Sequence, residues 1–385
     1  MRIVTAIDSF KGSLSSLQAG EAVREAALKL NAANEVIVRP LADGGEGTVD
    51  ALIAGLGGEC VEITVTGPMH TPVNAKYGIL HDGTAIMEMS AAAGITLVAH
   101  DERDPMIATT YGVGEMIADA IKRGCRRFLI GIGGSATNDG GVGMLTALGV
   151  KFCDNSGKPI RLGGRGLGDL VSISLDGLIP ELQECTFRIA CDVNNPLCGE
   201  CGCSAVYGPQ KGATDEMVQQ MDGWLRNYAR LTASILPASD AEYPGVGAAG
   251  GMGFAFKSFL NAQLQSGIQI VLEETELEKY IAAADLIVTG EGRLDAQTVM
   301  GKAPIGVAKL AKKYGKPVVA FSGCITPDAD VCNAHGIDAF FPIVPGVVTL
   351  EEALNPENAY KNLVRTAEQA LRLLTLGSEN NFHNT

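Results

Sequence analysis

The chain has 385 residues, with 30 Lys and Arg against 44 Asp and Glu, and a formal net charge of −14. This negative charge argues against nucleic acid or an anionic membrane as a partner, and the sequence has no basic run that would override it. No apolar run approaches the length of a membrane span. With 48 Gly and 46% hydrophobic residues, the composition is typical of a soluble α/β protein, and the length favours two domains.

The first 60 residues predict two strands that alternate with two helices. The run "RIVTAI" at residues 2–7 is short and apolar, as in a buried parallel strand, and "SLQAGEAVREAALKL" follows with helical spacing. Next, "EVIVRPLA" predicts a second strand and "GTVDALIAGLGG" a second helix that ends in glycines. This βαβα order is typical of a doubly wound sheet.

The pattern changes near Cys60. The segment "VEITVTG" alternates apolar and polar residues, which predicts a half-solvated antiparallel strand, and "AKYGIL-HDG-TAIMEM" predicts a hairpin. After it we expect a helix in "GVGEMIADAIKRG", strands in "RRFLIGIGG" and "FRIACDV", and a long amphipathic helix in "MVQQMDGWLRNYARLTASIL". This middle part of the chain therefore predicts a mixed α/β region.

From residue 285 the simple alternation returns, with predicted strands in "DLIVTG", "PVVAFSG" and "AFFPIV". Neither end of the chain has enough strands for a good core, but together they predict one five-stranded parallel sheet covered by helices. We therefore predict a discontinuous Rossmann- or flavodoxin-like domain of residues 1–60 and 286–385, with an inserted mixed α/β domain of residues 61–285. Two sequential domains divided near residue 175 would leave both terminal sets of strands without partners. The active site is expected in the cleft between the two domains.

Loops at the predicted strand ends carry the polar residues, and ligands bind at such ends in α/β sheets. These loops combine glycines, carboxylates, hydroxyl or amide groups and, in several cases, one cation. Glycine lets backbone N–H groups approach an anion closely, although Gly-Gly and Asp-Gly are also ordinary turn residues. The predicted binding residues are Asp8, Ser13, Asp43, Gly44, Gly45, Glu46, Gly133, Gly134, Ser135, Thr137, Asn138, Asp139, Asn194, Lys211, Gly250, Gly251, Gly290, Glu291, Gly292 and Lys302.

The charged members of these loops suggest phosphate and metal chemistry. Positive charge stands in the loops at Lys11, Lys211, Arg293 and Lys302, in a chain that is acidic overall. Oxygen ligands suit Mg²⁺, and we assign Asp43, Glu46 and Asp295 as its candidate ligands. Lys11 and Arg293 are also predicted to act in catalysis.

Several standard nucleotide and hydrolase motifs are absent. The sequence has no GxxxxGK[ST], no protein-kinase motif set and no GxSxG. The one GxGxxG, "GVGAAG" at residues 245–250, follows no predicted strand, so it argues weakly for a dinucleotide site. None of the five histidines lies in the polar loops. Loops with glycines, cations and carboxylates that could bind Mg²⁺, in a sequence without a covalent nucleophile motif, suit phosphoryl transfer.

The ten cysteines are irregularly spaced, which favours reduced thiols and a cytoplasmic protein. The tight cluster "CGECGC" holds Cys198, Cys201 and Cys203. A zinc site usually needs four ligands, and no second pair or nearby histidine completes this one. We therefore favour loop or buried thiols there.

Eight motifs in register carry a resemblance to a known family. They are "DSFKGSLS", "ADGGEGT", "EMSAAAG", "GIGGSATNDGG", "ACDVNNPL", "GPQKGAT", "GAAGGMG" and "TGEGRLDAQTVMGKAP", and the likeness runs from residue 1 to about residue 345. The series resembles the bacterial glycerate kinases of the glucarate and glyoxylate pathways. The resemblance implies phosphorylation of D-glycerate with ATP and Mg²⁺, most naturally at the 2-hydroxyl, in a two-domain α/β protein. The cysteine-rich "CGECGC" departs from the expected glycine-containing loop.

The residues leave the proton acceptor open. Asp192 ends the predicted strand "RIACD", a rigid Val-Asn-Asn-Pro turn follows it, and no glycine pair or cation adjoins it. We therefore favour Asp192 as the base, with Asp43 and Asp295 as the alternatives. A non-catalytic sugar-acid or nucleotide sensor, a kinase for a related hydroxy acid and a dehydrogenase remain as alternative functions. The oligomeric state, including a homo-oligomer, also stays open.

Overall fold

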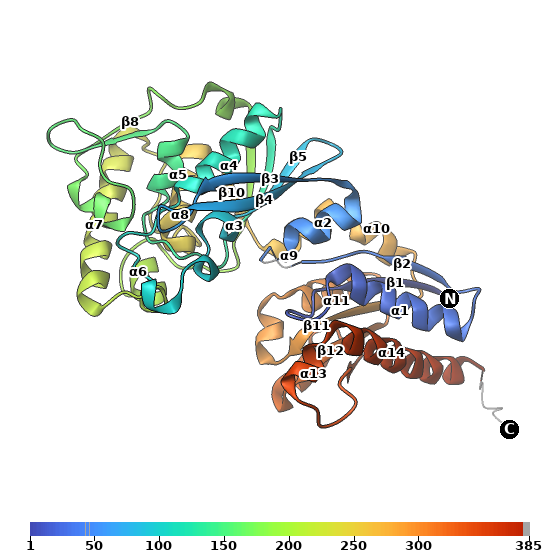
Figure 1. Cartoon of the computed structure of the whole chain (residues 1–385). Helices are drawn as coiled ribbons and strands as arrows, with labels where there is room; N and C mark the ends of the chain where they lie inside the picture. The colour runs from blue at the N-terminus through green and yellow to red at the C-terminus, as the bar shows by residue number, and fades with distance from the viewer. Residues whose placement is uncertain (43, 46, 380–385) are drawn as a thin grey trace. The chain divides into compact units, whose positions relative to one another are not determined.

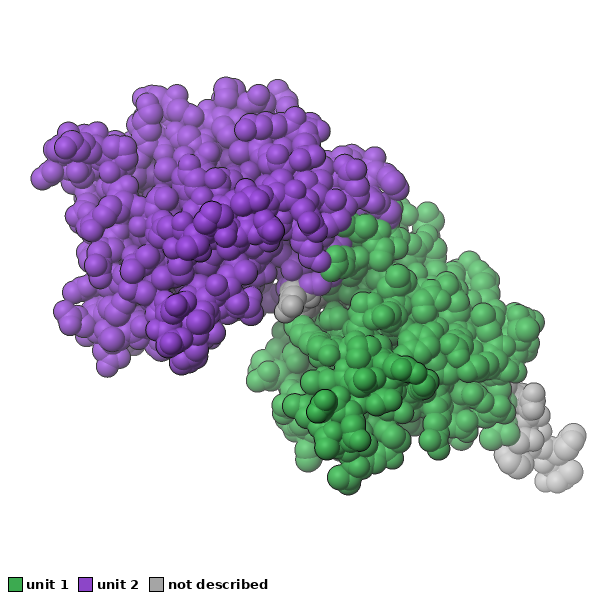
Figure 2. All heavy atoms as spheres, viewed as in Figure 1, with its two compact units in different colours: residues 1–43, 50–56, 268–385 green, residues 44–49, 57–267 purple. Residues whose placement is uncertain are grey.

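The computed structural model describes residues 1–42, 44–45 and 47–379, and its fold is α/β, as predicted (Figure 1). The described residues form two compact units (Figure 2). The first unit comprises residues 1–43, 50–56 and 268–385, and the second comprises residues 44–49 and 57–267. The predicted domain boundaries after residues 60 and 285 stay a prediction. Each unit is described below by itself.

The first unit contains a five-stranded sheet with the strand order β13-β12-β11-β1-β2. Every neighbouring pair is parallel, so the predicted sheet, built from both ends of the chain, is confirmed. Numbered within this unit alone, the order is the flavodoxin-like 2-1-3-4-5. The strands are β1 (Arg2–Ile7), β2 (Glu35–Val38), β11 (Leu286–Leu294), β12 (Val318–Ile325) and β13 (Ala339–Pro342).

Helices cover this sheet, and its central strands β1, β11 and β12 are largely buried on both faces. Ile3 and Ile7 of β1 share a core with α1 and α14, while the alternate residues Val4 and Ala6 are also fully or almost fully buried. Helix α14 was not predicted, although its apolar residues recur at helical spacing. The helices are α1 (Ser16–Leu30), α2 (Thr48–Leu56), α9 (Gly267–Glu274), α10 (Leu277–Ala282), α11 (Ala303–Lys313), α12 (Val331–Ala334), α13 (Leu350–Leu354) and α14 (Pro356–Glu379).

The second unit contains a six-stranded mixed sheet with the order β10-β9-β6-β5-β4-β3. The predicted hairpin is confirmed, because β4 pairs with β5 in antiparallel register. Strands β5, β6, β9 and β10 run parallel, and β7 and β8 form a separate two-stranded sheet. The strands are β3 (Gly58–Thr66), β4 (Pro72–Leu80), β5 (Thr84–Glu88), β6 (Arg127–Gly131), β7 (Lys151–Cys153), β8 (Ser172–Ser174), β9 (Thr186–Ala190) and β10 (Gln263–Gln265).

The helices of the second unit surround a separate apolar core that includes Tyr77, Phe128 and Tyr228. The predicted long amphipathic helix is α7, and Thr214 caps its first turn by accepting a hydrogen bond from the N–H of Met217. Across the described residues, no helix is both long and apolar enough to span a membrane. The helices are α3 (Ser90–Ala93), α4 (Tyr111–Lys122), α5 (Val142–Ala147), α6 (Cys203–Tyr207), α7 (Asp215–Ile235) and α8 (Ala248–Leu260).

The strand order of the first unit fixes where a ligand is expected. From β1 the chain adds β2 on one side of the sheet, whereas β11, β12 and β13 follow one another on the other side. The carboxyl ends of β1 and β11 therefore form the topological switch point. Asp8 follows β1 there, and Glu291 lies in the last part of β11. The fold therefore brings together two loops that are about 280 residues apart in sequence.

Candidate active site

A small charged cavity lies at this switch point. Its volume is about 300 Å³. All of its lining residues except Ser9 are among the site residues predicted from the sequence. The lining consists of Asp8, Ser9, Lys11, Glu291, Gly292, Arg293 and Lys302.

Backbone hydrogen bonds hold Asp8 at the end of β1. Its N–H donates to the carbonyl of Gly290 at 2.9 Å, which continues the ladder between β1 and β11. Its Oδ1 accepts from the N–H of Ser9 at 2.7 Å, and the residue is only 6% exposed. The Ser16 hydroxyl donates to the carbonyl of Ile7, so the first turn of α1 is tied to the end of the strand. Asp8 is therefore held in a fixed place beside β11.

Glu291 and Lys302 form the partly buried half of the cavity. Glu291 is 7% exposed, and its Oε1 accepts from the Thr298 hydroxyl at 2.7 Å. The Lys302 Nζ lies 3.5 Å from Glu291 Oε2 and 3.6 Å from Asp295 Oδ1. Burial raises the pKa of Glu291, and the Thr298 hydroxyl and Lys302 oppose this shift. The ammonium group of Lys302 therefore pairs with two carboxylates just before the first residue of α11.

The other two cations of the cavity face solvent. The Arg293 Nε lies 3.2 Å from Asp295 Oδ2, and the Arg293 side chain is 63% exposed. Lys11 is also exposed. Among the described residues, three cationic side chains and two carboxylates line the cavity, and Asp295 next to it faces two of the cations. The cavity therefore gathers three cations in a chain with a net charge of −14, which suits the predicted binding of an anion.

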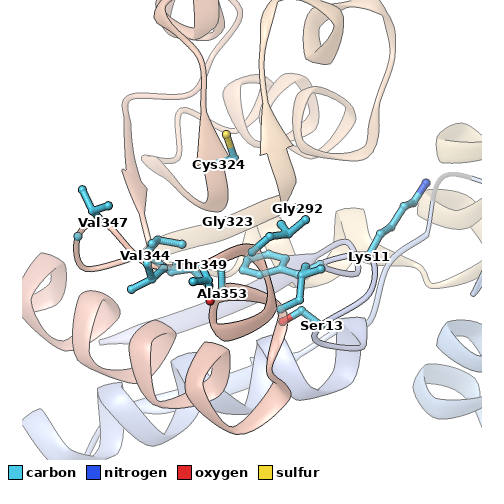
Figure 3. A pocket seen from close by; sticks show the side chains of 15 residues that line it. Lys11, Ser13, Gly292, Gly323, Cys324, Val344, Val347, Thr349 and Ala353 are labelled. Carbon is cyan, nitrogen blue, oxygen red and sulfur yellow. The ribbon is translucent and has the colours of Figure 1, made fainter.

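A larger apolar pocket shares two lining residues, Lys11 and Gly292, with the charged cavity (Figure 3). Its volume is about 620 Å³. The predicted site residue Ser13 lines this pocket, and within the described residues its buried hydroxyl has no hydrogen-bond partner. The rest of the lining was not predicted from the sequence, although the apolar run that continues past β13 could have indicated it. Besides these three residues, the lining consists of Phe10, Gly323, Cys324, Ile343, Val344, Gly346, Val347, Val348, Thr349, Leu350, Ala353 and Leu354.

In the second unit, the predicted residues of "GIGGSATNDGG" and "GPQKGAT" form a buried cluster around Lys211. The Lys211 Nζ donates to the Ser135 hydroxyl and to the Thr137 carbonyl, both at 2.7 Å. Lys211 is 2% exposed, and burial lowers its pKa to about 8 despite the nearby Cys203 and Asp139. This lysine is thus enclosed by protein groups, unlike Lys302.

Asp139 organises the same loop from within. Its Oδ2 accepts from the N–H and the hydroxyl of Thr110, at 2.8 and 2.9 Å, and from the N–H of Gly143 at 3.2 Å. Its Oδ1 accepts from the N–H of Gly141 at 3.1 Å. Burial raises the pKa of Asp139, and these four hydrogen bonds oppose the shift. Asn138 is buried as well and donates to the Ser204 hydroxyl at 2.8 Å. These contacts support the loop, and a ligand contact stays a prediction.

The predicted Gly250 and Gly251 pack against this loop with left-handed backbone angles. The φ of Gly250 is 66° and that of Gly251 is 91°. The Gly250 carbonyl accepts from the N–H of Gly140 at 2.9 Å, and a Cβ at Gly250 would lie 2.1 Å from the Thr137 carbonyl oxygen. Only glycine fits this position without moving the backbone.

The remaining predicted residues of the second unit lie near strand ends. Gly133 and Gly134 follow β6, and Asp192 and Asn194 follow β9, and all four are exposed. The Asp192 Oδ1 accepts from the N–H of Gly267 at 3.1 Å. Gly44 and Gly45 precede α2; a Cβ at Gly44 would lie 2.5 Å from the Ala190 Cβ, and the Gly45 carbonyl accepts from the Thr48 hydroxyl at 2.7 Å.

The predicted Mg²⁺ ligands are described only in part. Asp43 and Glu46 lie outside the described residues. Asp295 accepts from the N–H of Gln297 at 3.0 Å and also faces Arg293 and Lys302. In the described part of the chain, no group of three or more His, Cys, Asp or Glu side chains is placed to hold a metal ion.

Comparison with known proteins decides the family. Residues 3–375 match the glycerate kinase family. The chain belongs to this family. Glycerate 2-kinase of Escherichia coli K12 is 46% identical over 381 residues, which cover 99% of this chain and 100% of that protein. Glycerate kinase of Bacillus subtilis 168 is 48% identical, covering 95% of this chain and 96% of that protein.

A solved structure agrees with this family assignment. The crystal structure of a protein assigned as glycerate kinase 2 from Salmonella typhimurium LT2 matches with a TM-score of 0.91 at 44% identity, and each chain is covered completely. The glycerate kinase fold is therefore shared along the whole length of the present chain.

The cysteine-rich stretch of this family member contains free thiols. Cys198 and Cys203 are buried and Cys201 is exposed. The Cys203 Sγ donates to the Leu197 carbonyl at 3.2 Å. Burial raises the pKa of Cys198 to about 12 and that of Cys203 to about 11. Thiols with raised pKa values are poor nucleophiles and poor metal ligands at neutral pH.

Proposed function

We propose that this protein phosphorylates D-glycerate at the 2-hydroxyl, using ATP and releasing ADP and 2-phospho-D-glycerate. The observation that carries the proposal is the 46% identity with a glycerate 2-kinase over 99% of this chain. The charged cavity at the switch point supports it, because phosphoryl transfer depends mainly on positioning and on neutralisation of charge.

Lys11, Arg293 and Lys302 are the proposed phosphate ligands. They are the cations of the charged cavity, and the two exposed ones can move toward an incoming phosphate. Lys302 is held by Glu291 and Asp295, so its ammonium group is already positioned before a ligand arrives. Positioned charges of this kind stabilise the transition state without reorganisation during the reaction.

Asp192 is the proposed proton acceptor. Its carboxylate is exposed to solvent at the end of β9, and the N–H of Gly267 orients one of its oxygens. The hydroxyl of glycerate must lose its proton as it attacks phosphorus, and a carboxylate can accept that proton. The described residues place no histidine among the residues that line the charged cavity.

Mg²⁺ is proposed as the metal of the reaction. Of its predicted ligands, Asp295 is the one that the structure describes, and its oxygens face Arg293, Lys302 and the N–H of Gln297. Asp295 could contact an ion that arrives with the nucleotide if it exchanged one of these partners, because Mg²⁺ is usually held by one or two carboxylates together with substrate phosphates. When bound, the ion would neutralise phosphate charge.

The proposed activity is tested by coupled ADP release from the purified chain with D-glycerate, L-glycerate, glycolate and lactate. We expect Mg²⁺-dependent turnover with D-glycerate, and ³¹P NMR of the product should show the 2-phosphate. A 3-phosphate would overturn the regiochemistry. ADP release with another hydroxy acid but not with D-glycerate would replace the substrate.

The role of Asp192 is tested by Asp192→Asn, with the exposed neighbour Glu200→Gln as the matched control. A general base contributes about 10²–10⁴-fold, so we expect a loss of kcat of that order with a nearly unchanged KM for ATP. Glu200→Gln should remain close to wild type. Rescue of Asp192→Asn by high Mg²⁺ would instead identify Asp192 as a metal ligand.

The expected cytoplasmic location stays a prediction. It is compatible with ten free cysteines, since disulfides are rare in that compartment.

A further inference from the structure

We infer that the apolar pocket of the first unit binds the purine base and ribose of ATP, and that the adjoining charged cavity receives the phosphates. This inference rests on the proposed kinase function and assigns one of its two substrates to one unit. It concerns the residues of a single compact unit, in which both cavities are formed.

The two cavities adjoin each other at shared lining residues. Lys11 and Gly292 line both of them, so the apolar pocket opens beside the phosphate-binding cations. In Figure 3 the Lys11 side chain extends away from Val344 and Val347, with its ammonium at the far end. One molecule with an apolar end and an anionic end would therefore occupy both cavities at once.

The position in the sheet suits a nucleotide. The apolar pocket lies beyond the carboxyl ends of three adjacent strands, with Gly292 from β11, Cys324 from β12 and Ile343 just after β13. The charged cavity lies next to it, between β1 and β11. Ligands of doubly wound sheets bind outside the carboxyl ends of the strands and at the switch point, and this pair of cavities covers both places.

The lining favours a base over a second anion. Among the described residues that line the pocket, Lys11 is the one charged side chain and Phe10 the one aromatic ring, and the others are mainly aliphatic. A volume of about 620 Å³ lies within the usual range of small-molecule sites. Glycerate is small, polar and anionic, so it would leave most of this apolar surface without a partner.

Exposed apolar side chains lie at the same place. Val347 is 107% exposed, Leu350 is 74% exposed and Val348 is 41% exposed, and all three line the pocket. A cluster of exposed large aliphatic side chains is unusual on a monomer surface and marks a binding site. The flat face of a purine would bury such side chains and leave the triphosphate in the charged cavity.

Cys324 provides a direct probe, because this thiol is exposed and lines the pocket. Cys60 and Cys201 are exposed thiols elsewhere in the chain and serve as internal controls. The wild-type protein is alkylated with iodoacetamide alone, or with ADP, adenosine, tripolyphosphate or D-glycerate, and each thiol is followed by peptide mass spectrometry.

We expect ADP and adenosine to slow the alkylation of Cys324 several-fold, while Cys60 and Cys201 react as before. Tripolyphosphate and D-glycerate should leave Cys324 reactive. Protection by tripolyphosphate or D-glycerate but not by adenosine would overturn the inference. So would protection that increases with protein concentration in the absence of nucleotide, since a second copy of the chain would then cover the pocket.

A substitution that fills the pocket gives an independent test. Ala353→Phe places a ring in the lining, and Leu373→Phe on the exposed face of α14 is the matched control. We expect Ala353→Phe to raise the KM for ATP at least tenfold without changing the KM for D-glycerate, and Leu373→Phe to change neither. If the wild-type enzyme turns over D-glycerate but Ala353→Phe leaves the KM for ATP unchanged, this inference fails alone. If the wild type shows no turnover, the proposed function fails, and Cys324 protection still reports on nucleotide binding.

Discussion

Lys302 in the first unit and Lys211 in the second stand in similar loops, beside glycines, acids and hydroxyl groups, and both were predicted as phosphate ligands. Their surroundings differ. The Lys302 side chain is 33% exposed and faces two carboxylates at an open cavity, whereas Lys211 is 2% exposed and is satisfied by Ser135 and Thr137.

The difference shows that loops of similar composition can place a lysine either at a binding cavity or inside the protein. In an open cavity, a cation keeps donors for a ligand, and its effect is on binding and catalysis. In a buried loop, the same cation satisfies protein acceptors, and its effect is on the stability of the loop. Four variants separate the effect on activity from the effect on stability.

Lys11→Ala removes an exposed cation of the charged cavity and, of these four variants, should have the largest effect on activity. We expect kcat/KM to fall about 10²–10³-fold, as for the loss of one charge-stabilising donor, because the transferred phosphoryl group loses a positive partner. Unfolding in urea should shift by no more than about 0.5 kcal/mol, since the side chain is exposed. Steady-state kinetics and urea titration measure the two effects.

Lys309→Ala, an exposed lysine on α11 outside both cavities, is the control and should keep normal activity. If Lys11→Ala, Arg293→Ala and Lys302→Ala all retain near-normal kcat/KM, the charged cavity is not the phosphate site. The assignment of Lys302 to ligand binding would then be wrong.

The sequence could predict the sheet of the first unit, and the polar loops that line its charged cavity, for the same reason. Each strand is a short apolar run that ends at a polar residue, and parallel strands place those ends at one edge. Asp8 and Glu291 could therefore be assigned to one place despite their separation along the chain.

The burial of Lys211 and the apolar pocket could not be predicted in the same way. Whether a lysine between glycines is buried depends on segments that are distant in sequence, here Ser135 and Thr137, and local composition does not specify them. The pocket is lined by ordinary aliphatic residues after β13, such as Val344 and Val348, which would also suit a protein core.

Gly250→Ala should destabilise the second unit most. The φ of Gly250 is 66°, and the new Cβ would lie 2.1 Å from the Thr137 carbonyl oxygen, so the loop that holds Lys211 must move. Backbone strain and overpacking each cost about 1–3 kcal/mol, and we expect a loss of about 2–4 kcal/mol in the free energy of unfolding.

Gly223→Ala is the matched control, because Gly223 lies in α7 and nothing is within 4 Å of its added Cβ. Alanine at a helix interior should raise stability by about 0.5–1 kcal/mol. Equal effects of the two substitutions on the urea midpoint would show that the close approach at Gly250 does not support the loop.

Asp139→Asn tests the acid at the centre of the buried loop. The carboxylate accepts four hydrogen bonds, and an amide NH₂ group at the Oδ1 position would face the N–H of Gly141 without accepting from it. Leaving a buried donor unsatisfied costs about 1–3 kcal/mol, which is the expected loss of stability in urea unfolding.

Asp154→Asn is the control, since Asp154 accepts from the N–H groups of Ser156 and Lys158 in an exposed turn. Water can replace those bonds, so its loss should be no more than about 1 kcal/mol. A larger effect at Asp154 than at Asp139 would contradict the idea that burial makes this loop structural.

Lys211→Met tests the electrostatic side of the comparison through pH. Burial lowers the pKa of Lys211 from 10.5 to about 8, so between these values the unfolded chain binds a proton that the folded chain has released. The contribution of Lys211 to the free energy of unfolding therefore rises with pH from about 8 to 10.5, with a slope of up to about 1.4 kcal/mol per pH unit. The methionine variant lacks this rise, which urea unfolding from pH 7.5 to 10 would measure as a difference from wild type.

Cys203→Ala is a control that should change the pH dependence of stability in the opposite direction. Cys203 and Asp139 are titratable groups close enough to influence the pKa of Lys211. Burial raises the pKa of Cys203 from 9.0 to about 11, so the folded chain keeps a proton that the unfolded chain loses, and the contribution of Cys203 to stability falls across that interval. Removing Cys203 should therefore steepen the rise of stability with pH, whereas removing Lys211 should flatten it. If Lys211→Met left the pH profile unchanged, Lys211 would titrate alike in the folded and unfolded chain, and its burial would have no electrostatic effect on stability.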